Sequence, residues 1–299
     1  RGEDATIVMN KAVEFIDKQV KADKPFMAAI WYHHVHMPLR QNPEFAKLYP
    51  GHGTKETTYY SNVTALDSEI VRLRKHLRKL GIAEDTMLWF ASDNGPLRKE
   101  STVLHTATVR GQKFVYSGLG SAGAYRGVKG ELYEGGIRVP GILEWPAKIK
   151  KHRKTNVPCV TTDYVPTVLD ALGIELPKDR AYDGISLMPL IEGKTNKRTE
   201  PIGFKCKGMT AWMTERYKLL RMAPREPWQL FDMQADPYET TDLSKTKPEV
   251  LKQMLAQWDV WAKSCEAECQ AVWKKYPRGS GLPNDKTAKK PREKKPKTK

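Results

Sequence analysis

Apolar residues recur at helical spacing in three long stretches of this 299-residue chain. The spacing predicts a helix over 4–21, which Asp4 can cap, and a closing amphipathic helix over 248–275. A third predicted helix, over 57–80, carries apolar residues at alternating intervals of four and three, so that they share one face. The members of that stripe are Tyr59, Val63, Leu66, Ile70, Leu73, Leu77 and Leu80.

Short continuous apolar runs follow the two N-terminal helices. The runs FMAAIWYH (26–33) and TMLWFAS (86–92) are typical of strands buried on both faces, and RVPGILEWP (138–146) is a third strand candidate. A further helix is predicted over 161–173. Helices, strands and polar loops that alternate in this way predict an α/β domain with a mostly parallel sheet flanked by helices.

The pattern changes near 193–200, where the sequence becomes polar. Beyond this point, 202–222 and 228–233 alternate apolar and polar residues as antiparallel strands do. We therefore expect three parts. Residues 1–195 form the α/β domain, 196–277 form a small α+β subdomain of antiparallel sheet and helix, and 278–299 form a disordered basic tail.

The formal net charge of +16 raises the question of a nucleic-acid partner. Much of the excess lies in 286–299, which contains eight basic residues, one acidic residue and no apolar side chain larger than alanine. Such a segment cannot bury surface, and we expect it to be solvated or to bind a polyanion such as a sulfated glycan. No basic helix with interleaved aromatics occurs, so no specific nucleic-acid partner is expected. No run approaches the roughly 18 apolar residues of a membrane span, so no membrane-spanning segment is expected.

The four cysteines are Cys159, Cys206, Cys265 and Cys269, and none belongs to a Cys-x-x-Cys pair. A structural zinc site is therefore not supported. We expect most of these residues to be buried thiols, and their redox state stays open.

Two polar loops directly follow the predicted strands over 26–33 and 86–92. The carboxyl ends of parallel strands meet at one edge of an open α/β sheet, where ligands bind, so both loops should lie there. In the second loop, Asp93 and Asn94 offer a carboxylate and an amide oxygen, which suit Ca²⁺ or Mg²⁺. The Asp-Asn-Gly sequence is also typical of a simple turn, and the tripeptide alone does not separate these interpretations.

The first loop contains three histidines. On a strand, His34 and His36 point to one side and His33 to the other, so the group could bind a transition metal or simply pack. Farther along, glycines bracket Lys129 in RGVKGELYEGGIRVP (126–140). Glycine lets the backbone approach a ligand, and the lysine supplies a charge for an oxyanion, although a solvated lysine in a connecting loop explains the segment equally well. The residues alone thus indicate a divalent cation and an anionic substrate.

Six segments occur in the order found in one known family. They are KPFMAAIWYHHVHMPL, ASDNGP, GSAGAYRGVKGELYEGGIRVPGILEWP, TTDYVPTVLDALGI, DGISLMPLIEGK and WQLFDMQADPYETTDL. Through them, residues 4 to about 275 resemble the sulfatase family of the alkaline phosphatase superfamily. The resemblance implies an alkaline-phosphatase-like fold and a calcium-dependent hydrolase of sulfate esters, often of carbohydrates, whose nucleophile is a formylglycine made from Cys or Ser.

The resemblance also implies roles for four residues. Asp93 and Asn94 match two calcium ligands. Lys129 matches the lysine that contacts the sulfate and the leaving oxygen, and His36 matches a histidine that hydrogen-bonds the sulfate group. The neighbouring histidines receive no catalytic role. A metal ion and cationic side chains in these places would stabilise charge on the sulfuryl oxygens.

The first half of the family pattern is missing. The chain contains no Cys-x-Pro-x-Arg or Ser-x-Pro-x-Arg segment and no early aspartate pair to complete the calcium shell. We therefore expect the C-terminal portion of a longer sulfatase, whose N-terminal half supplies the formylglycine and the other ligands. The isolated chain should lack turnover and should aggregate, because a sheet without its early strands exposes an edge and a face. Family members are commonly periplasmic, extracellular or lysosomal, so the same is expected here.

Three other interpretations stay open. The chain could belong to a phosphodiesterase or phosphonate hydrolase of the same superfamily, which the upstream nucleophile would distinguish. It could be a non-catalytic sulfatase-like module that binds acidic glycans through its tail. A nucleic-acid binder is the third, with only the net charge in its favour.

Overall fold

The computed structural model describes residues 4–97, 106–109, 112–115 and 119–275. The chain divides into two compact units, 1–243 and 244–299. The second unit contains the helix α6 (Pro248–Lys275), which confirms the predicted closing helix. The tail predicted over 278–299 lies outside the described residues, and the predicted division at 195/196 stays a prediction.

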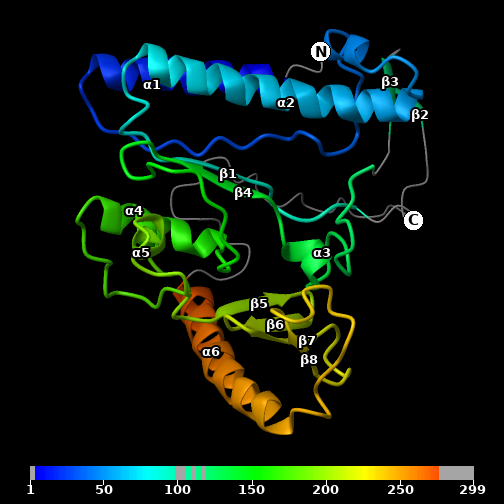
Figure 1. The fold of residues 1–299 in the computed structure, drawn as a ribbon, viewed down its shortest axis with the longest axis vertical. Helices are drawn as coiled ribbons and strands as arrows, with labels where there is room; N and C mark the ends of the chain where they lie inside the picture. Colours follow the sequence, from blue (N-terminus) through cyan, green and yellow to red (C-terminus); the bar gives the residue numbers. More distant parts are fainter. Residues whose placement is uncertain (1–3, 98–105, 110–111, 116–118, 276–299) are drawn as a thin grey trace, which may run out of the picture. The chain divides into compact units, whose positions relative to one another are not determined.

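The described residues of the first unit form two long helices, several short ones and three sheets (Figure 1). The helices are α1 (Asp4–Lys21), η1 (Phe45–Leu48), α2 (Thr54–Lys79), α3 (Glu134–Ile137), η3 (Thr161–Asp163), α4 (Tyr164–Ala171) and α5 (Met188–Ile191). The strands are β1 (Leu88–Ala91), β2 (Thr106–Val109), β3 (Gln112–Val115), β4 (Gly141–Glu144), β5 (Ile202–Cys206), β6 (Met209–Met213), β7 (Tyr217–Arg221) and β8 (Gln229–Asp232). They pair in the orders β1–β4, β2–β3 and β5–β6–β7–β8.

The helices α1 and α2 lie side by side and share a small apolar core (Figure 1). Met9 and Ile16 of α1 meet Leu73 and Leu77 of α2, and all four side chains are buried. Both helices confirm their predictions. Gly81, with a φ of +73°, follows α2 where a left-handed residue commonly ends a helix.

The apolar stripe predicted for α2 is wrong in its N-terminal half. There the buried face is polar, because the loop before α2 packs against it through hydrogen bonds. Asn62 donates through Nδ2 to the carbonyl of Arg40 at 2.8 Å, and Ser61 Oγ accepts the backbone N–H of Asn42 at 3.2 Å. Val63, a member of the predicted stripe, is 42% exposed. Periodicity located the helix but not the face that this loop covers.

The ribbon of β1 and β4 lies between two helical layers. Successive residues of β1 point to opposite faces, so Leu88 joins the core of α1 and α2 while Trp89 points the other way. Trp89 stacks on Tyr164 of α4, with ring centroids 4.5 Å apart, and packs with Leu143 of β4 against α5. This layering of helix, ribbon and helix fixes the end of β1, where the predicted metal ligands follow.

The strand predicted over 26–33 is wrong, because these residues pair with none of the described strands. Phe26, Ile30 and Tyr32 pack against the core of α1 and α2. Met27 and Trp31 point away and are 66% and 86% exposed. A strand needs a neighbour that takes up its backbone hydrogen bonds, and the described part of the chain offers none. The pairings among the described strands are antiparallel, so the parallel pairing expected for the α/β domain is not found among them.

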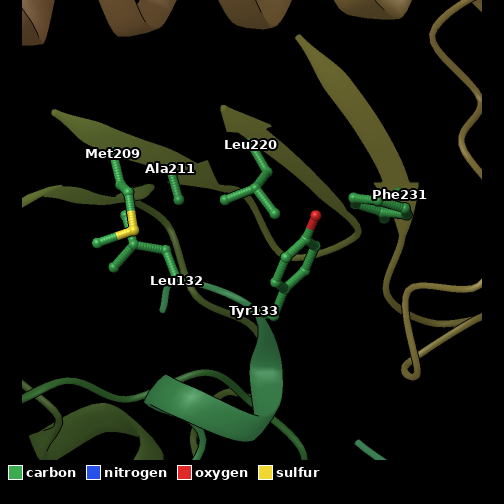
Figure 2. Close-up of a cluster of buried hydrophobic side chains, with 6 residues drawn as sticks. All are labelled: Leu132, Tyr133, Met209, Ala211, Leu220 and Phe231. Carbon is green, nitrogen blue, oxygen red and sulfur yellow. The ribbon is translucent and has the colours of Figure 1, made fainter. Parts of the chain in front are cut away.

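The sheet β5–β8 has the antiparallel order that alternation predicted. Ala211, Leu220 and Phe231, from three adjacent strands, contribute to one buried cluster. Leu132 and Tyr133, just before α3, point toward these side chains from the other side of the cluster (Figure 2). The small sheet thus supports the segment that leads into α3.

A buried ion pair joins the start of α4 to the segment before β5. Arg198 donates to both carboxylate oxygens of Asp163, at 2.8 and 3.0 Å, and both side chains are almost fully buried. The same carboxylate accepts the backbone N–H groups of Val160 and Ile185. These hydrogen bonds offset the cost of burying the charge.

None of the four cysteines, all of which the structure describes, is in a disulfide. Cys159, Cys206 and Cys269 are exposed, and Cys265 is half-buried. The predicted burial is therefore wrong, because these residues lie in a loop, at a strand end and on a helix surface rather than in a core. The described residues contain no helix that is both long and apolar enough to cross a membrane.

The double substitution Met27→Gln with Trp31→Gln should reduce self-association of the chain at least several-fold, because it removes exposed apolar surface. Stability should not fall, since both side chains are largely solvent-exposed. Sedimentation velocity measures the association, and the urea midpoint measures stability.

The matched control for the double variant is Phe26→Gln. The ring of Phe26 packs edge-on against that of Phe15, with centroids 6.0 Å apart. It should lower the free energy of unfolding by about 2 kcal/mol and leave the association in place. Unchanged association in the double variant would contradict the prediction.

Candidate functional site

The loop that follows β1 presents two oxygen ligands side by side. Asp93 accepts the backbone N–H of Asn94 on Oδ1 at 2.9 Å, and Asn94 donates through Nδ2 to the carbonyl of Gly95 at 2.9 Å. Ser92 Oγ donates to the carbonyl of Asn94 at 3.1 Å and closes the turn. These hydrogen bonds use Oδ1 of Asp93 and Nδ2 of Asn94, and they do not involve Oδ2 of Asp93 or Oδ1 of Asn94.

The segment that carries Lys129 is fastened directly to this loop. The backbone N–H of Lys129, a half-buried residue, donates to the carbonyl of Pro96 at 2.8 Å. The backbone N–H of Gly95 donates to the carbonyl of Gly136 at 2.9 Å. The structure therefore joins the segment of the predicted lysine to the loop of both predicted metal ligands through backbone hydrogen bonds.

Glycines make this close approach possible. A Cβ atom on Gly95 would lie 1.8 Å from the carbonyl oxygen of Gly135, and one on Gly135 would lie 2.2 Å from that of Gly127. No side-chain carbon fits at these distances, so glycine is required at Gly95 and Gly135. The sequence predicted that the glycines around Lys129 approach a ligand; in the structure, Gly135 instead lies against the backbone of Gly127.

A buried ion triad holds the segment after Lys129 against the small sheet. Lys218 Nζ lies 2.9 Å from Oε1 of Glu134 and 2.8 Å from Oε1 of Glu239, and all three side chains are almost fully buried. Oε2 of Glu239 also accepts the backbone N–H of Glu134 at 2.6 Å. In this way α3, which begins at Glu134, is fixed to β7 and to the loop after β8.

Aromatic and cationic side chains complete this attachment. The guanidinium carbon of Arg126 lies 4.0 Å from the ring centroid of Tyr133, and Arg126 donates to the carbonyl of Glu239 at 3.2 Å. Tyr133 Oη donates to the side-chain amide oxygen of Gln229 at 2.9 Å. No pattern in the sequence indicates the triad, because 84 and 105 positions separate Glu134 from Lys218 and Glu239.

The triad contains two carboxylates and one ammonium group, which changes how Glu239 titrates. Burial raises the pKa of Glu239 above its ordinary value; Lys218 opposes the rise, and the carboxylate of Glu134 adds to it. The contribution of Glu239 to stability is therefore fully present below its ordinary pKa. It is lost as the pH rises through the raised pKa.

His36 stands on a separate support, a turn after the extended segment. Its backbone N–H donates to the carbonyl of His33 at 2.7 Å, and its Nδ1 lies 2.6 Å from the carbonyl of Met37. A carbonyl only accepts, so we assign a proton to Nδ1. The other ring nitrogen, Nε2, can then donate to an anion only when the ring is an imidazolium.

The predicted alternation of the three histidines is wrong, because the loop is a turn rather than a strand. The rings of His33 and His36 lie together, with centroids 5.1 Å apart. The side chain of His34 is instead buried, with Nδ1 3.0 Å from Oδ1 of Asp4, and this burial lowers the pKa of the imidazole. His34 is thus a packed residue that ties the turn to α1.

Asp93 and Asn94 suit a hard divalent cation but form only part of a site. Calcium takes about six to eight oxygen ligands. In the part of the chain that the structure describes, no group of three or more His, Cys, Asp or Glu side chains could hold a metal ion. The two residues fit as one side of a calcium site whose other side needs further ligands.

The layered α/β fold thus places two side-chain oxygens on one loop and a lysine on the segment that is hydrogen-bonded to that loop. Sequence profiles identify the class further. The profile of the sulfatase family matches residues 1–174, and that of the C-terminal domain of N-sulphoglucosamine sulphohydrolase matches residues 128–259. The chain belongs to the sulfatase family, whose members are sulfuric ester hydrolases of the alkaline phosphatase superfamily.

Individual relatives match only part of their own length. Human steryl-sulfatase is 36% identical over 187 residues, which cover 62% of this chain and 29% of that protein. The uncharacterized sulfatase YdeN of Escherichia coli is 30% identical over 64% of this chain and 31% of that protein. The solved structure of Ps i-CgsB has a TM-score of 0.72 and 26% identity, over 92% of this chain and 60% of that one. The structural similarity confirms the predicted alkaline-phosphatase-like α/β fold.

Gly95→Ala should force the two loops apart, because the new methyl group would lie 1.8 Å from a carbonyl oxygen of the other segment. We expect the free energy of unfolding, measured by urea titration, to fall by roughly 2–3 kcal/mol. The matched control is Gly141→Ala in β4, where nothing lies within 4 Å of the new carbon and stability should not fall. Equal stability of the two variants would show that the loops are not held this closely.

Glu239→Gln should change the pH dependence of stability, because it removes a carboxyl group whose pKa is raised in the folded chain. Relative to the parent chain, its free energy of unfolding should increase with pH by up to about 1.4 kcal/mol per unit, from the ordinary pKa of glutamate to the raised one. Urea unfolding at several values between about pH 4 and about pH 8 measures the difference.

Glu144→Gln is the control of opposite sign for this experiment. The hydrogen bond from Arg74 lowers the pKa of Glu144, so that the stability contributed by this carboxylate is lost as the pH falls. The Glu144 variant should therefore lose stability relative to the parent chain as the pH rises from the lowered pKa to the ordinary pKa of glutamate, and the series is extended for this purpose to about pH 3. Parallel pH curves for both variants and the parent chain would refute the assigned shifts.

Proposed function

We propose that this chain supplies one side of a sulfatase active site, with Asp93 and Asn94 as calcium ligands and Lys129 and His36 as sulfate-binding residues. The observation that carries the proposal is the pair of backbone hydrogen bonds, at 2.8 and 2.9 Å, between the Asp93 loop and the Lys129 segment. They keep the loop of the proposed calcium ligands beside the segment that carries Lys129, which supports a shared role in binding a sulfate ester. The family match over 1–174 includes all four residues.

Hydrolysis of a sulfate ester places negative charge on the sulfuryl oxygens and on the leaving oxygen. Lys129 would meet this charge with a compact ammonium group on a segment held in place by its backbone. His36 would add a donor through Nε2, since its Nδ1 proton is directed to the carbonyl of Met37. The imidazolium form of His36 is therefore the productive one, because the neutral ring would turn a lone pair toward the sulfate.

Asp93 would bind calcium through Oδ2 and Asn94 through Oδ1. When bound, the ion offsets negative charge on the sulfuryl oxygens. The other side-chain atoms, Oδ1 of Asp93 and Nδ2 of Asn94, are used inside the turn and orient the two ligand oxygens. With two of about six ligands, the chain alone should bind calcium weakly.

The remaining ligands and the formylglycine would lie in a part of the protein outside these 299 residues. The chain spans 60% of Ps i-CgsB, and it contains no Cys-x-Pro-x-Arg or Ser-x-Pro-x-Arg segment. The exposed side chains of Met27 and Trp31 lie on an extended segment that pairs with no described strand. A neighbouring strand and its flanking helix would cover such a surface.

Carbohydrate sulfates are the substrate class that we propose. The profile of the C-terminal domain of N-sulphoglucosamine sulphohydrolase includes Lys129 in its match. Ps i-CgsB, also solved in complex with k-i-k-neocarrahexaose, has a TM-score of 0.69 and 26% identity in that complex. Human steryl-sulfatase is 36% identical in sequence, so a sterol sulfate is the competing class.

The purified chain should not hydrolyse 4-nitrophenyl sulfate above the level of its Lys129→Ala variant, because the nucleophile is absent. The chain extended by its upstream reading frame should contain the formylglycine segment and should hydrolyse the ester. In that extended enzyme, Lys129→Ala should lower kcat about 10²- to 10³-fold, the usual effect of losing one group that stabilises developing charge.

The matched control for this prediction is Lys148→Ala, which removes a lysine that lies 3.9 Å from Glu192 on the surface. It should leave kcat within about two-fold, because exposed ion pairs contribute little. Full activity of the extended Lys129→Ala enzyme would overturn the assignment of the lysine. Turnover by the unextended chain would overturn the assignment of the nucleophile to another segment.

A further inference from the structure

A pocket of about 390 Å³ lies at the N-terminal end of α2 and the loop before it. Its wall consists of Tyr49, His52, Tyr59, Tyr60 and Val63. The rings of His52 and Tyr60 meet at 86° with centroids 5.3 Å apart, and those of Tyr49 and Tyr60 meet at 48° and 5.4 Å. The rings of the wall are therefore tilted against one another rather than stacked.

Hydrogen bonds hold this wall in place. Tyr49 Oη lies 2.5 Å from Thr64 Oγ1, and Thr57 Oγ1 donates to the carbonyl of His52 at 3.3 Å. Both threonines belong to α2, so the loop that carries Tyr49 and His52 is tied to the helix that carries Tyr60. A wall fixed in this way loses little conformational freedom when a ligand binds.

The pocket adjoins the proposed sulfate site. A Cβ atom on Gly120 would lie 3.0 Å from Cβ of Pro96 and 3.4 Å from the hydroxyl of Tyr59. Pro96 and Tyr59 therefore flank the same glycine. Pro96 is also the residue whose carbonyl accepts the backbone N–H of Lys129. One short segment thus separates the aromatic wall from the loop that carries the proposed calcium ligands.

We propose that this pocket binds the sugar ring that bears the sulfate ester, an inference that rests on the proposed sulfatase function and adds a site for the leaving group. A pyranose ring combines apolar C–H faces with hydroxyl groups around its edge. Tyrosine and histidine combine an apolar ring with a polar tip. Tyr59, Tyr60 and His52 can therefore pack against the C–H faces of the sugar and form hydrogen bonds with its hydroxyl groups.

The same wall suits a sterol poorly. A sterol offers a large apolar surface and few polar groups. Binding it here would desolvate the polar tips of Tyr59, Tyr60 and His52 without giving them partners, which disfavours such a complex. Val63 is the pocket's aliphatic residue, and it is 42% exposed. The chemistry of the wall therefore favours the carbohydrate.

Binding of methyl galactopyranoside and of its 6-sulfate to the full chain tests the proposal, with NMR chemical-shift titration as the readout. Tyr60→Ala should weaken both ligands by about three- to ten-fold, the usual contribution of an aromatic contact. Tyr60→Phe keeps the ring and should retain most of the affinity, and an unchanged helical circular dichroism spectrum shows that each variant folds. Val71→Ala, at an exposed position of the same helix outside the pocket, is the matched control and should change neither affinity.

Two further arms separate this proposal from the function on which it rests. Lys129→Ala should lower the affinity for the sulfated sugar and leave that for the unsulfated sugar unchanged. If both sugars bind equally and Lys129→Ala changes neither affinity, the sulfate site is contradicted and the pocket is not. Unchanged sugar affinity in Tyr60→Ala would overturn the pocket. Displacement of the sugar by a steroid sulfate at lower concentration would also overturn it, in favour of a sterol site.

Discussion

The buried ammonium group of Lys218 is the point on which the arrangement of the site depends. It lies between the carboxylates of Glu134 and Glu239 and so joins β7, the start of α3 and the loop after β8. Because α3 comes just after the Lys129 segment, fixing α3 fixes one end of that segment. Removing one partner from a buried charge group is far more costly than removing an exposed pair, since the charge left behind has no compensation. The position of the Lys129 segment therefore depends on a residue of the small sheet that lies outside the proposed sulfate site.

The Lys129 segment is also constrained sterically, by its close approach to the loop after β1. The ribbon of β1 and β4 is held between two helical layers, so the Asp93 loop leaves a fixed strand end. β4 runs antiparallel to β1, and its amino end therefore lies beside the carboxyl end of β1. The Lys129 segment leads into that amino end, which is why this segment lies beside the loop of the proposed metal ligands. Glycine at Gly95 and Gly135 then lets the two backbones touch. The site is thus built on rigid elements, which is what precise placement of charged groups requires.

Local patterns predicted the elements that local sequence decides. Helical spacing located α1 and α6, and alternation located the antiparallel sheet β5–β8. Patterns failed where a partner decides the outcome. Residues 26–33 have the composition of a buried strand, but a strand exists only with a neighbour, and the histidine alternation failed with it. Resemblance to the family predicted the roles of Asp93, Asn94 and Lys129. No local pattern predicts the triad that supports the Lys129 segment, because its members are far apart in the sequence and each alone is typical of a surface charge.

The proposed active site would be assembled from a part that this chain already holds in place and a part that it lacks. The supports of Lys129, Asp93 and Asn94 lie inside this chain, so that half of the site is ordered before any further ligands arrive, and little entropy remains to be lost there. The segment around Trp31 is held on one side only, since Met27 and Trp31 point away from the core and are exposed. The aromatic pocket belongs to the ordered half, because Gly120 places Tyr59 beside Pro96. A sugar ring and its sulfate would therefore meet two sites at a fixed separation, and that separation, rather than either site alone, would select which hydroxyl of the sugar carries the ester.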